Sequence, residues 1–258
     1  MSNQPRWHYV QARLQARHGE RLTEDDWRAL GAAQSFDHYL DRAHATTLHR
    51  FVDRLNASMN SHSLERLLGA AWRDYVAEVA SWLDRDWQAA VQWTALAPDL
   101  PAIAALLRDD IPAWLKDDAR WADFTEGDAP QRLTRLTTSP FAPLLPASDR
   151  ATGLAARWTA HWRRWWPASA KADARALTAL TQLVIDHHTQ LTASLPPETS
   201  APHRLDLARR LTRLFRRHGA SPVAVFSHLA LVALDMERLR GGLTRRRLFT
   251  PARAREAA

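Results

Sequence analysis

The sequence predicts an all-α protein built as a multi-lobed helical bundle. Apolar side chains recur with the i, i+3, i+4 spacing of amphipathic helices along most of the 258 residues. No segment alternates apolar and polar residues over the length of a strand, and no Asn-Gly or Asp-Gly hairpin turn occurs. We therefore expect helices joined by short connections, and no sheet.

The composition excludes several kinds of site. The chain has no Cys, which excludes disulfides, cysteine-ligated metals and a cysteine nucleophile. It has 8 Gly and neither a GxGxxG nor a GxxxxGK[ST] motif, so a glycine-rich phosphate loop is not expected. No run approaches the roughly 18 apolar residues that cross a bilayer, and the N-terminus lacks an apolar signal region. We expect a cytoplasmic protein.

The first part of the chain carries clear helix boundaries. A helix is expected over Trp7–His18, and Gly19 is expected to end it. Thr23 is a good N-cap and Asp26 follows three residues later, so a second helix is expected to begin there. An apolar stripe indicates a third helix and consists of Phe36, Tyr39, Leu40 and Ala43.

The longest predicted helix of the first half covers Leu64–Leu83, with Ser61 as its N-cap. A shorter helix is expected over Trp87–Leu96 and ended by Pro98, and Asp99 is expected to cap the next one. Four further helices are expected in the second half, over Leu154–Trp166, Leu177–Leu195, Leu205–His218 and Pro222–Gly241. The first of these places Trp158, Trp162, Trp165 and Trp166 on one face, which we interpret as core.

A stretch rich in Pro and Ser suggests the domain organisation. Pro140, Pro143 and Pro146 lie within 139–150, where helix breakers are most concentrated. We therefore predict one or more N-terminal helical lobes over 1–138, a Pro-rich connection over 139–150, and a C-terminal helical lobe over 151–258.

Four stretches taken in order resemble one protein family. They are Tyr9–Arg17 (YVQARLQAR), Phe36-x-x-x-Leu40 followed by Thr46, Asp99–Arg108 (DLPAIAALLR), and Pro222 through Leu234–Arg240 (LDMERLR). Together they are similar to the central-stalk connector of rotary ATPases, which occurs in the prokaryotic V/A-type and the eukaryotic V-type enzymes. The chain departs from that pattern in its shorter length, in Ala233 where the family often has an acid, and in Thr47-Leu48 after the threonine.

This resemblance implies a mechanical role. The family has an all-helical, funnel-shaped body of similar lobes that sits peripherally on the cytoplasmic face of the membrane proteolipid ring. The central shaft inserts into its cavity, so rotation is coupled to ion or proton translocation. The family implies no enzyme activity, no catalytic residue, no cofactor and no metal. The alternative is an adaptor of the same fold that serves a different complex.

Six residues are predicted to serve interaction or lobe packing. Tyr9 and Arg13 belong to the first stretch of the resemblance. Asp99 with Arg108, and Asp235 with Arg240, each combine an acid with an arginine along an apolar helix, which suggests a weak internal repeat. We expect these four residues to lie at equivalent places in two similar lobes and to form salt bridges between helices.

Three patterns allow other chemistry. Asp186-His187-His188 is similar to a phosphoesterase signature but falls within a helical run without the further acidic clusters that such enzymes need. His62 and Glu65 have a spacing seen in helical metal sites, although capping of the long helix explains them better. Neither HExxH nor GxSxG occurs, so an enzyme is not expected.

The basic residues of the C-terminal third leave a further choice open. Arginines are densest over 209–217 and 245–247, and Leu207, Leu211 and Phe215 place the first group opposite an apolar stripe. The arginines form either a solvated face or a docking surface for an acidic protein or phospholipid head groups. Nucleic acid is an unlikely partner, because acidic residues are interspersed along most helices.

Overall fold

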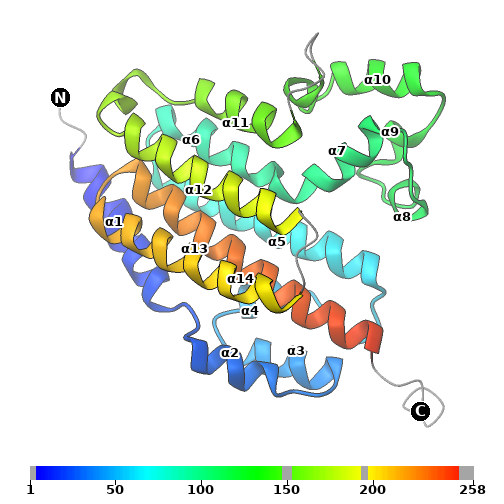
Figure 1. The fold of residues 1–258 in the computed structure, drawn as a ribbon, viewed down its shortest axis with the longest axis horizontal. Coiled ribbons are helices and arrows are strands. Elements are labelled where there is room, and N and C mark those ends of the chain that lie inside the picture. Colours follow the sequence, from blue (N-terminus) through cyan, green and yellow to red (C-terminus); the bar gives the residue numbers. More distant parts are fainter. Residues whose placement is uncertain (1–3, 147–152, 193–196, 250–258) are drawn as a thin grey trace. The chain divides into compact units, whose positions relative to one another are not determined.

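The computed structural model describes the backbone of residues 4–146, 153–192 and 197–249 and the side chains of residues 6–146, 153–187 and 202–248 (Figure 1). These residues form α-helices, short 3-10 turns and connections, and no strand occurs among them. The predicted all-α class is confirmed.

The chain divides into two compact units. One, here called the split unit, combines residues 1–84 with residues 170–258, and the other, the continuous unit, comprises residues 85–169. This division differs from the predicted one, which placed the boundary in the Pro-rich stretch. The physical reason is that Phe141 and Leu144 of this stretch are buried, and Phe141 stacks on Trp121 with ring centroids 5.0 Å apart. Phe141 and Leu144 therefore belong to the core of the continuous unit, whereas Pro140 and Pro146 are exposed, and 147–150 lie outside the described residues.

The split unit holds the first five and the last three α-helices. They are α1 (Gln4–Gly19), α2 (Glu24–Gly31), α3 (Phe36–His44), α4 (His49–Val52), α5 (Ser61–Trp82), α12 (Ala174–Thr192), α13 (Pro197–Arg217) and α14 (Pro222–Phe249). The predicted start of α2 is confirmed, because the Thr23 side chain accepts a hydrogen bond from the Asp26 N–H and the Asp26 carboxylate accepts one from the Thr23 N–H. The predicted stripe of α3 is buried throughout.

Two helix boundaries of the split unit differ from the prediction. Asn60, not Ser61, caps α5, because Asn60 has an extended backbone and its side-chain oxygen accepts the Ser63 N–H at 2.7 Å. Helix α14 continues beyond Gly241 to Phe249. At Gly242 the helix backbone lies so close to the Tyr39 ring that only glycine fits, which shows that this residue serves packing and not helix termination.

The core of the split unit surrounds α14. This helix contacts α1, α3, α5, α12 and α13 (Figure 1), and it buries apolar residues on several sides. The first half of α14 has no polar face, since Val223–Leu229 are all buried, whereas the charged residues of the helix begin at Asp235. The fully buried side chains of the unit include Leu14, Val52, Val76, Leu211, Phe215, Leu231, Leu239 and Leu243.

The continuous unit is made of shorter helices. They are α6 (Arg85–Trp93), the 3-10 turn η1 (Thr94–Asp99), α7 (Leu100–Leu107), α8 (Ala113–Lys116), α9 (Ala122–Thr125), α10 (Ala129–Thr137), the 3-10 turn η2 (Ala142–Leu144) and α11 (Leu154–Arg164). A further 3-10 turn, η3 (Ala168–Ala172), leads to α12. Pro98 lies inside η1, which joins α6 to α7 without an open loop.

The stretch Arg85–Leu107, which joins α6, η1 and α7, is long and apolar enough to cross a membrane by length and composition alone. We expected no such stretch from the sequence. Half of its most apolar window is buried inside the protein, as in the core helices of many proteins, so the finding is weak evidence for a membrane span.

The tryptophans of α11 only partly form core. Trp162 is buried and its indole N–H donates to the Ala90 carbonyl at 3.0 Å. The Trp93 indole N–H donates to the Trp158 carbonyl at 3.1 Å, which ties α6 to α11. Trp158 and Trp166 are half-buried, whereas Trp165 is 43% exposed. The expectation of a fully buried group therefore holds for Trp162 alone.

Candidate functional site

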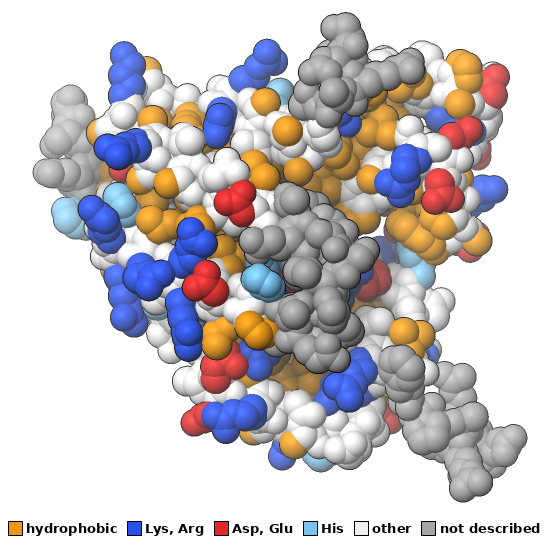
Figure 2. Space-filling model, in the orientation of Figure 1, with side chains coloured by type: hydrophobic (Ala, Val, Ile, Leu, Met, Phe, Trp, Pro, Cys, Tyr) orange, Lys and Arg blue, Asp and Glu red, His pale blue; other side chains and the backbone are white. Residues whose placement is uncertain are grey.

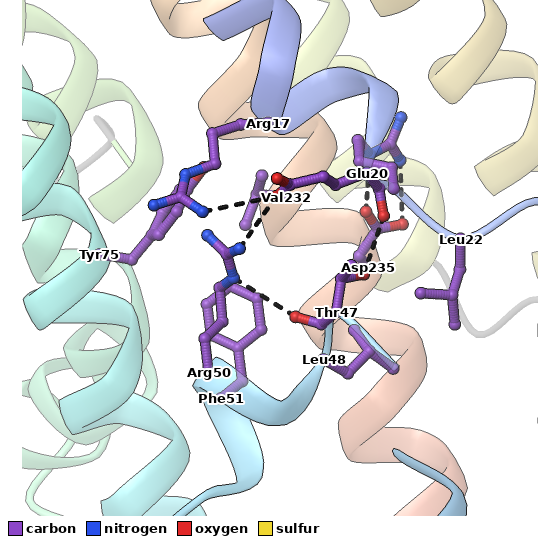
Figure 3. Close-up of a pocket in the computed structure, with 11 residues that line it drawn as sticks. Arg17, Glu20, Leu22, Thr47, Leu48, Arg50, Phe51, Tyr75, Val232 and Asp235 are labelled. Atoms are coloured by element: carbon purple, nitrogen blue, oxygen red, sulfur yellow. Dashed lines mark hydrogen bonds and ion pairs between the residues drawn. The ribbon is translucent and has the colours of Figure 1, made fainter. Parts of the chain in front are cut away.

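A pocket in the split unit lies where α1, α4, α5 and α14 meet (Figure 3). Its walls enclose about 350 Å³, part of which is open solvent. The lining combines charged with apolar and aromatic residues, which are Arg17, Glu20, Arg21, Leu22, Thr47, Leu48, Arg50, Phe51, Tyr75, Val232 and Asp235. The pocket therefore joins segments from both ends of the chain.

The strongest contact of the pocket is a bidentate ion pair. Arg21 Nε lies 2.7 Å from Asp235 Oδ2, and Arg21 Nη2 lies 2.9 Å from Asp235 Oδ1. The two side chains are only 18% and 13% exposed. Burial raises the pKa of Asp235 above its usual value, although Arg21 acts in the opposite direction. The pair therefore locks the segment after α1 to the middle of α14 at a considerable desolvation penalty.

A second cluster of charges surrounds Glu20. Its carboxylate accepts hydrogen bonds from Arg17 at 3.4 Å and from Arg50 at 3.1 Å, and its carbonyl accepts one from the Thr47 hydroxyl at 2.8 Å. Arg17 also donates to Glu78 at 2.8 Å. Each guanidinium of the pocket is thus paired with a carboxylate, and the three arginines are balanced by Glu20, Glu78 and Asp235.

Tyr75 and His228 form a buried polar pair next to the pocket. The Tyr75 hydroxyl lies 2.6 Å from His228 Nε2. Burial lowers the pKa of His228 to about 3 and raises the pKa of Tyr75 to about 12, so both groups are neutral at pH 7. The Tyr75 hydroxyl then donates to Nε2, which places the imidazole proton on Nδ1. Within the described residues, His228 Nδ1 and the buried Ser227 hydroxyl have no hydrogen-bond partner.

Helix α14 carries three more connections to the first part of the chain. Arg238 donates to both carboxylate oxygens of Glu24 at 2.8 and 3.0 Å, and Arg240 donates to Glu65 at 2.6 Å. Arg246 donates to the carbonyls of Ala33 and Gly31 at 2.8 and 2.7 Å. We call these contacts, together with the Arg21–Asp235 pair, the end-to-end network, because its partners lie at least 175 residues apart in sequence.

The predicted residues Tyr9 and Arg13 form a local contact of α1. The Arg13 guanidinium donates to the Tyr9 hydroxyl at 2.9 Å and lies 4.6 Å from the centroid of the Trp82 ring. Tyr9 itself is 45% exposed. Arg13 therefore joins α1 to the end of α5 through a cation–π contact.

The other four predicted residues are divided between the units. Asp235 and Arg240 belong to the end-to-end network: Arg240 pairs with Glu65 of α5, whereas Asp235 pairs with Arg21 in the segment between α1 and α2. In the continuous unit, Asp99 is buried and accepts a hydrogen bond from Arg120 at 2.5 Å, whereas Arg108 is exposed at the C-cap of α7. Asp99 directly precedes α7 and makes no side-chain cap bond, while Asp235 lies in the middle of a 28-residue helix. The two acids therefore differ in their place within the helix.

The patterns considered for metal chemistry do not assemble a site. Among the described residues, no three His, Asp or Glu side chains are grouped in a way that could hold a metal ion. Glu65 pairs with Arg240, and His187 is buried in α12, while the His188 side chain lies outside the described residues.

Several residues of the pocket were not predicted from the sequence. Arg17 lies within the first stretch of the resemblance, but nothing marked Glu20, Arg21 or Arg50, because arginine is frequent throughout the chain. His228 had a signal, since Ser227 and His228 interrupt the apolar run Val223–Leu234. Polar residues in such a run are either buried and paired or functional.

No family model matches the chain, and neither a curated protein nor a solved structure matches it. Within the described residues the chain is an all-α protein. Ion pairs join the first and last parts of its split unit.

Proposed function

We propose that the chain is a non-catalytic connector of a V/A-type rotary ATPase. In this role it links the central shaft to the membrane proteolipid ring on the cytoplasmic face and couples rotation to ion translocation. The observation that carries the proposal is spatial. Three of the four stretches that resemble the connector family, 9–17, 36–46 and 222–240, lie in the split unit, where α14 contacts both α1 and α3.

A connector must be stiff, because torque is lost wherever the body bends. The split unit has features that resist bending. Helix α14 is enclosed by five other helices, and the end-to-end network ties it to α5 and to the segments around α2. Interiors packed in this way have low compressibility and transmit strain.

The pocket also favours a mechanical role. Arg17, Arg21 and Arg50 hold carboxylates of the chain itself, and the Tyr75–His228 pair is buried and neutral. In the proposal these groups position helices, and the chain carries no catalytic residue, cofactor or metal.

The first test is purification from the organism that carries the gene. Cells with a tagged full chain are compared with untagged cells after detergent solubilisation of the membranes, and mass spectrometry quantifies the proteins that co-purify. We expect the proteolipid and shaft proteins of a rotary ATPase to be enriched together. Reproducible purification with neither of them would overturn the proposal, and a defined set of other proteins would favour an adaptor.

The second test measures coupling. In membrane vesicles from cells that lack the chain, we expect ATP-driven ion pumping to be lost. Expression of the wild-type chain should restore it. Arg21→Ala, which breaks the buried pair, should restore less pumping than Arg28→Ala, which breaks the exposed pair with Asp25. Pumping that is unaffected by loss of the chain would contradict the proposal.

A further inference from the structure

The outer face of α13 carries a row of arginines that we call the arginine stripe. Its members are Arg209, Arg213, Arg216 and Arg217, and all four are exposed. At about 100° per residue they fall within an arc of about 100°, over about 12 Å of helix length. Leu207, Leu211 and Phe215 are buried on the opposite side of the helix. The stripe therefore faces away from the core.

The four stripe arginines make no ion pair among the described residues, although the exposed Asp206, which pairs with Arg210, lies on the same face. Two other arginines of α13 have acidic partners, Arg204 with Glu237 at 3.4 Å and Arg210 with Asp206 at 3.7 Å. None of the four stripe arginines has a carboxylate partner within the part of the chain that the structure describes. Like charges four residues apart, as at 209, 213 and 217, destabilise a helix. The helix dipole favours cations at Arg216 and Arg217 in the last turn, but it does not account for Arg209, two turns earlier.

Neighbouring residues extend the positive surface. Lys171 and Arg175 are exposed around the start of α12, which packs against α13. Asp173, which lies between them in sequence, is half-buried and interacts electrostatically with His218 just beyond α13. Figure 2 shows Lys and Arg side chains gathered over the half of α13 that ends near α1, with few acidic side chains among them. An anionic partner would therefore meet several cations at once.

The geometry favours a flat anionic surface. Helices α12 and α14 both pack against α13, so α13 offers only its outer face to a partner. The polar Thr212 lies between the arginines, but its hydroxyl donates to the Ala208 carbonyl at 2.8 Å. Guanidinium groups bind phosphate oxygens in a bidentate manner, which suits lipid head groups.

We propose that the arginine stripe binds the phosphate head groups of an anionic phospholipid bilayer. The proposal goes beyond the proposed function, because a chain serving another complex would still bind the bilayer through this face. The two can fail separately, since this binding is measured with lipids alone and the connector role is measured with the other proteins of the ATPase.

The test is sedimentation of the full chain with vesicles. One set contains phosphatidylcholine alone and the other contains about 30% phosphatidylglycerol, and both are examined over a range of salt concentrations. We expect binding to the anionic vesicles that weakens as salt rises, and little binding to the neutral ones. Changing all four stripe arginines to Gln should lower the partition coefficient by roughly several hundred-fold, since each arginine near such a surface contributes about fivefold.

A matched control removes the same charge elsewhere. Arg66, Arg85, Arg163 and Arg164 are exposed and lie outside the stripe, and their change to Gln should reduce vesicle binding only slightly. Far-UV circular dichroism and a urea titration establish that both variants are folded. Equal loss in the two variants, equal binding to neutral vesicles, or stripe-dependent binding that is tighter to duplex DNA than to vesicles at the same salt would each overturn the proposal.

Discussion

Asp235 shows what a single buried charge does in this protein. Its carboxylate is largely removed from water and held by Arg21, and burial still raises its pKa. The direction of this pKa shift determines how the stability of the fold depends on pH. A carboxyl whose folded pKa is raised stabilises the fold most below its unfolded pKa, and this contribution is lost as pH rises through the folded pKa. At neutral pH the pair therefore serves to position α14 more than to stabilise the unit.

Removing one partner of this pair should be worse than removing both. Arg21→Ala leaves the Asp235 carboxylate buried without its cation, so we expect the free energy of unfolding to fall by about 3 kcal/mol. The double variant Arg21→Met, Asp235→Leu should be more stable than the single variant, because no unpaired charge remains. Urea titration at pH 7 measures both.

The control for this comparison is Arg28→Ala. Arg28 and Asp25 are 75% and 79% exposed, so the loss of their pair should not measurably change the urea midpoint. If the double variant were less stable than Arg21→Ala, the Arg21–Asp235 pair would be net stabilising and the interpretation above would be wrong.

His228 should make the protein sensitive to mild acid. Its folded pKa of about 3 lies below the ordinary histidine value, so unfolding takes up a proton between about pH 6.5 and pH 3. The full contribution of the neutral imidazole to the free energy of unfolding is present above about pH 6.5. Below about pH 6.5 the free energy of unfolding should fall by about 1.4 kcal/mol per pH unit. Urea titrations at pH 7, 6 and 5 measure this slope.

His228→Gln separates this effect from packing. Glutamine keeps an acceptor for the Tyr75 hydroxyl but does not titrate, so the slope should become shallower even if the variant is less stable at pH 7. A smaller slope should persist, because burial also lowers the pKa of His18. His8→Gln, at an exposed position of α1, should keep the wild-type slope, and an unchanged slope in His228→Gln would refute the prediction.

At the scale of the helix, α14 contains a glycine pair with two opposite roles. A Cβ at Gly242 would lie 2.5 Å from Tyr39 Cζ, whereas one at Gly241 would meet nothing within 4 Å. Tyr39 cannot easily move, since its ring is buried and Arg246 lies 4.1 Å from its centroid. Substitution of Gly242 therefore tests packing against Tyr39, and substitution of Gly241 tests helix propensity alone.

Gly242→Ala should destabilise the protein by about 1–3 kcal/mol through overpacking. Gly241→Ala should stabilise it by up to about 1 kcal/mol, because alanine is the better helix former at an open position. Thermal unfolding of the two variants beside the wild type tests the contrast. Equal shifts of the midpoint in the same direction would show that Tyr39 does not restrict this turn of α14.

Helix boundaries were predictable where the signal is local. The capping box of Thr23 and the stripe of α3 need only neighbouring residues, and both agree with the structure. The cap of α5 was displaced by one residue, because Asn60 and Ser61 are both good caps. The close contact of Gly242 with Tyr39 was not predictable, since the two residues lie about 200 apart in sequence, and the Gly-Gly pair by itself predicts the end of the helix.

Only one partner of each salt bridge at the candidate site could be predicted from the sequence. Asp235 and Arg240 were selected from an acid and arginine pattern along one helix, and their salt bridges are present. Their partners Arg21 and Glu65 were not identified, because they are separated from α14 by 214 and 175 residues and no local spacing encodes such a contact.

At the scale of the whole molecule, composition alone did not locate the two units. Proline and serine marked 139–150 as a connection, yet Phe141 and Leu144 are buried there. A buried turn and an open linker use the same helix breakers, and only the packing of the aromatic residues distinguishes them. The amino-acid composition likewise gives no sign that residues 1–84 and 170–258 pack into one unit.

The end-to-end network predicts that the two parts of the split unit open together. Arg21→Ala should speed hydrogen exchange in α14 as well as in α1, because the broken pair joins α14 to the segment after α1. Helices α7 and α11 of the continuous unit serve as the internal control and should keep their exchange rates. Faster exchange confined to α1 would show that α14 is held independently of the pair.

The split unit has a consequence for biosynthesis. The ribosome makes α1, α3 and α5 first, yet α14, which packs against all three, begins about 140 residues after the end of α5, an interval that includes the continuous unit. At about 5–20 residues per second, the nascent helices wait roughly 7–28 s with their apolar faces uncovered. During that interval the apolar faces that α14 covers in the folded protein stay without it, whereas the whole of the continuous unit, residues 85–169, has already been made.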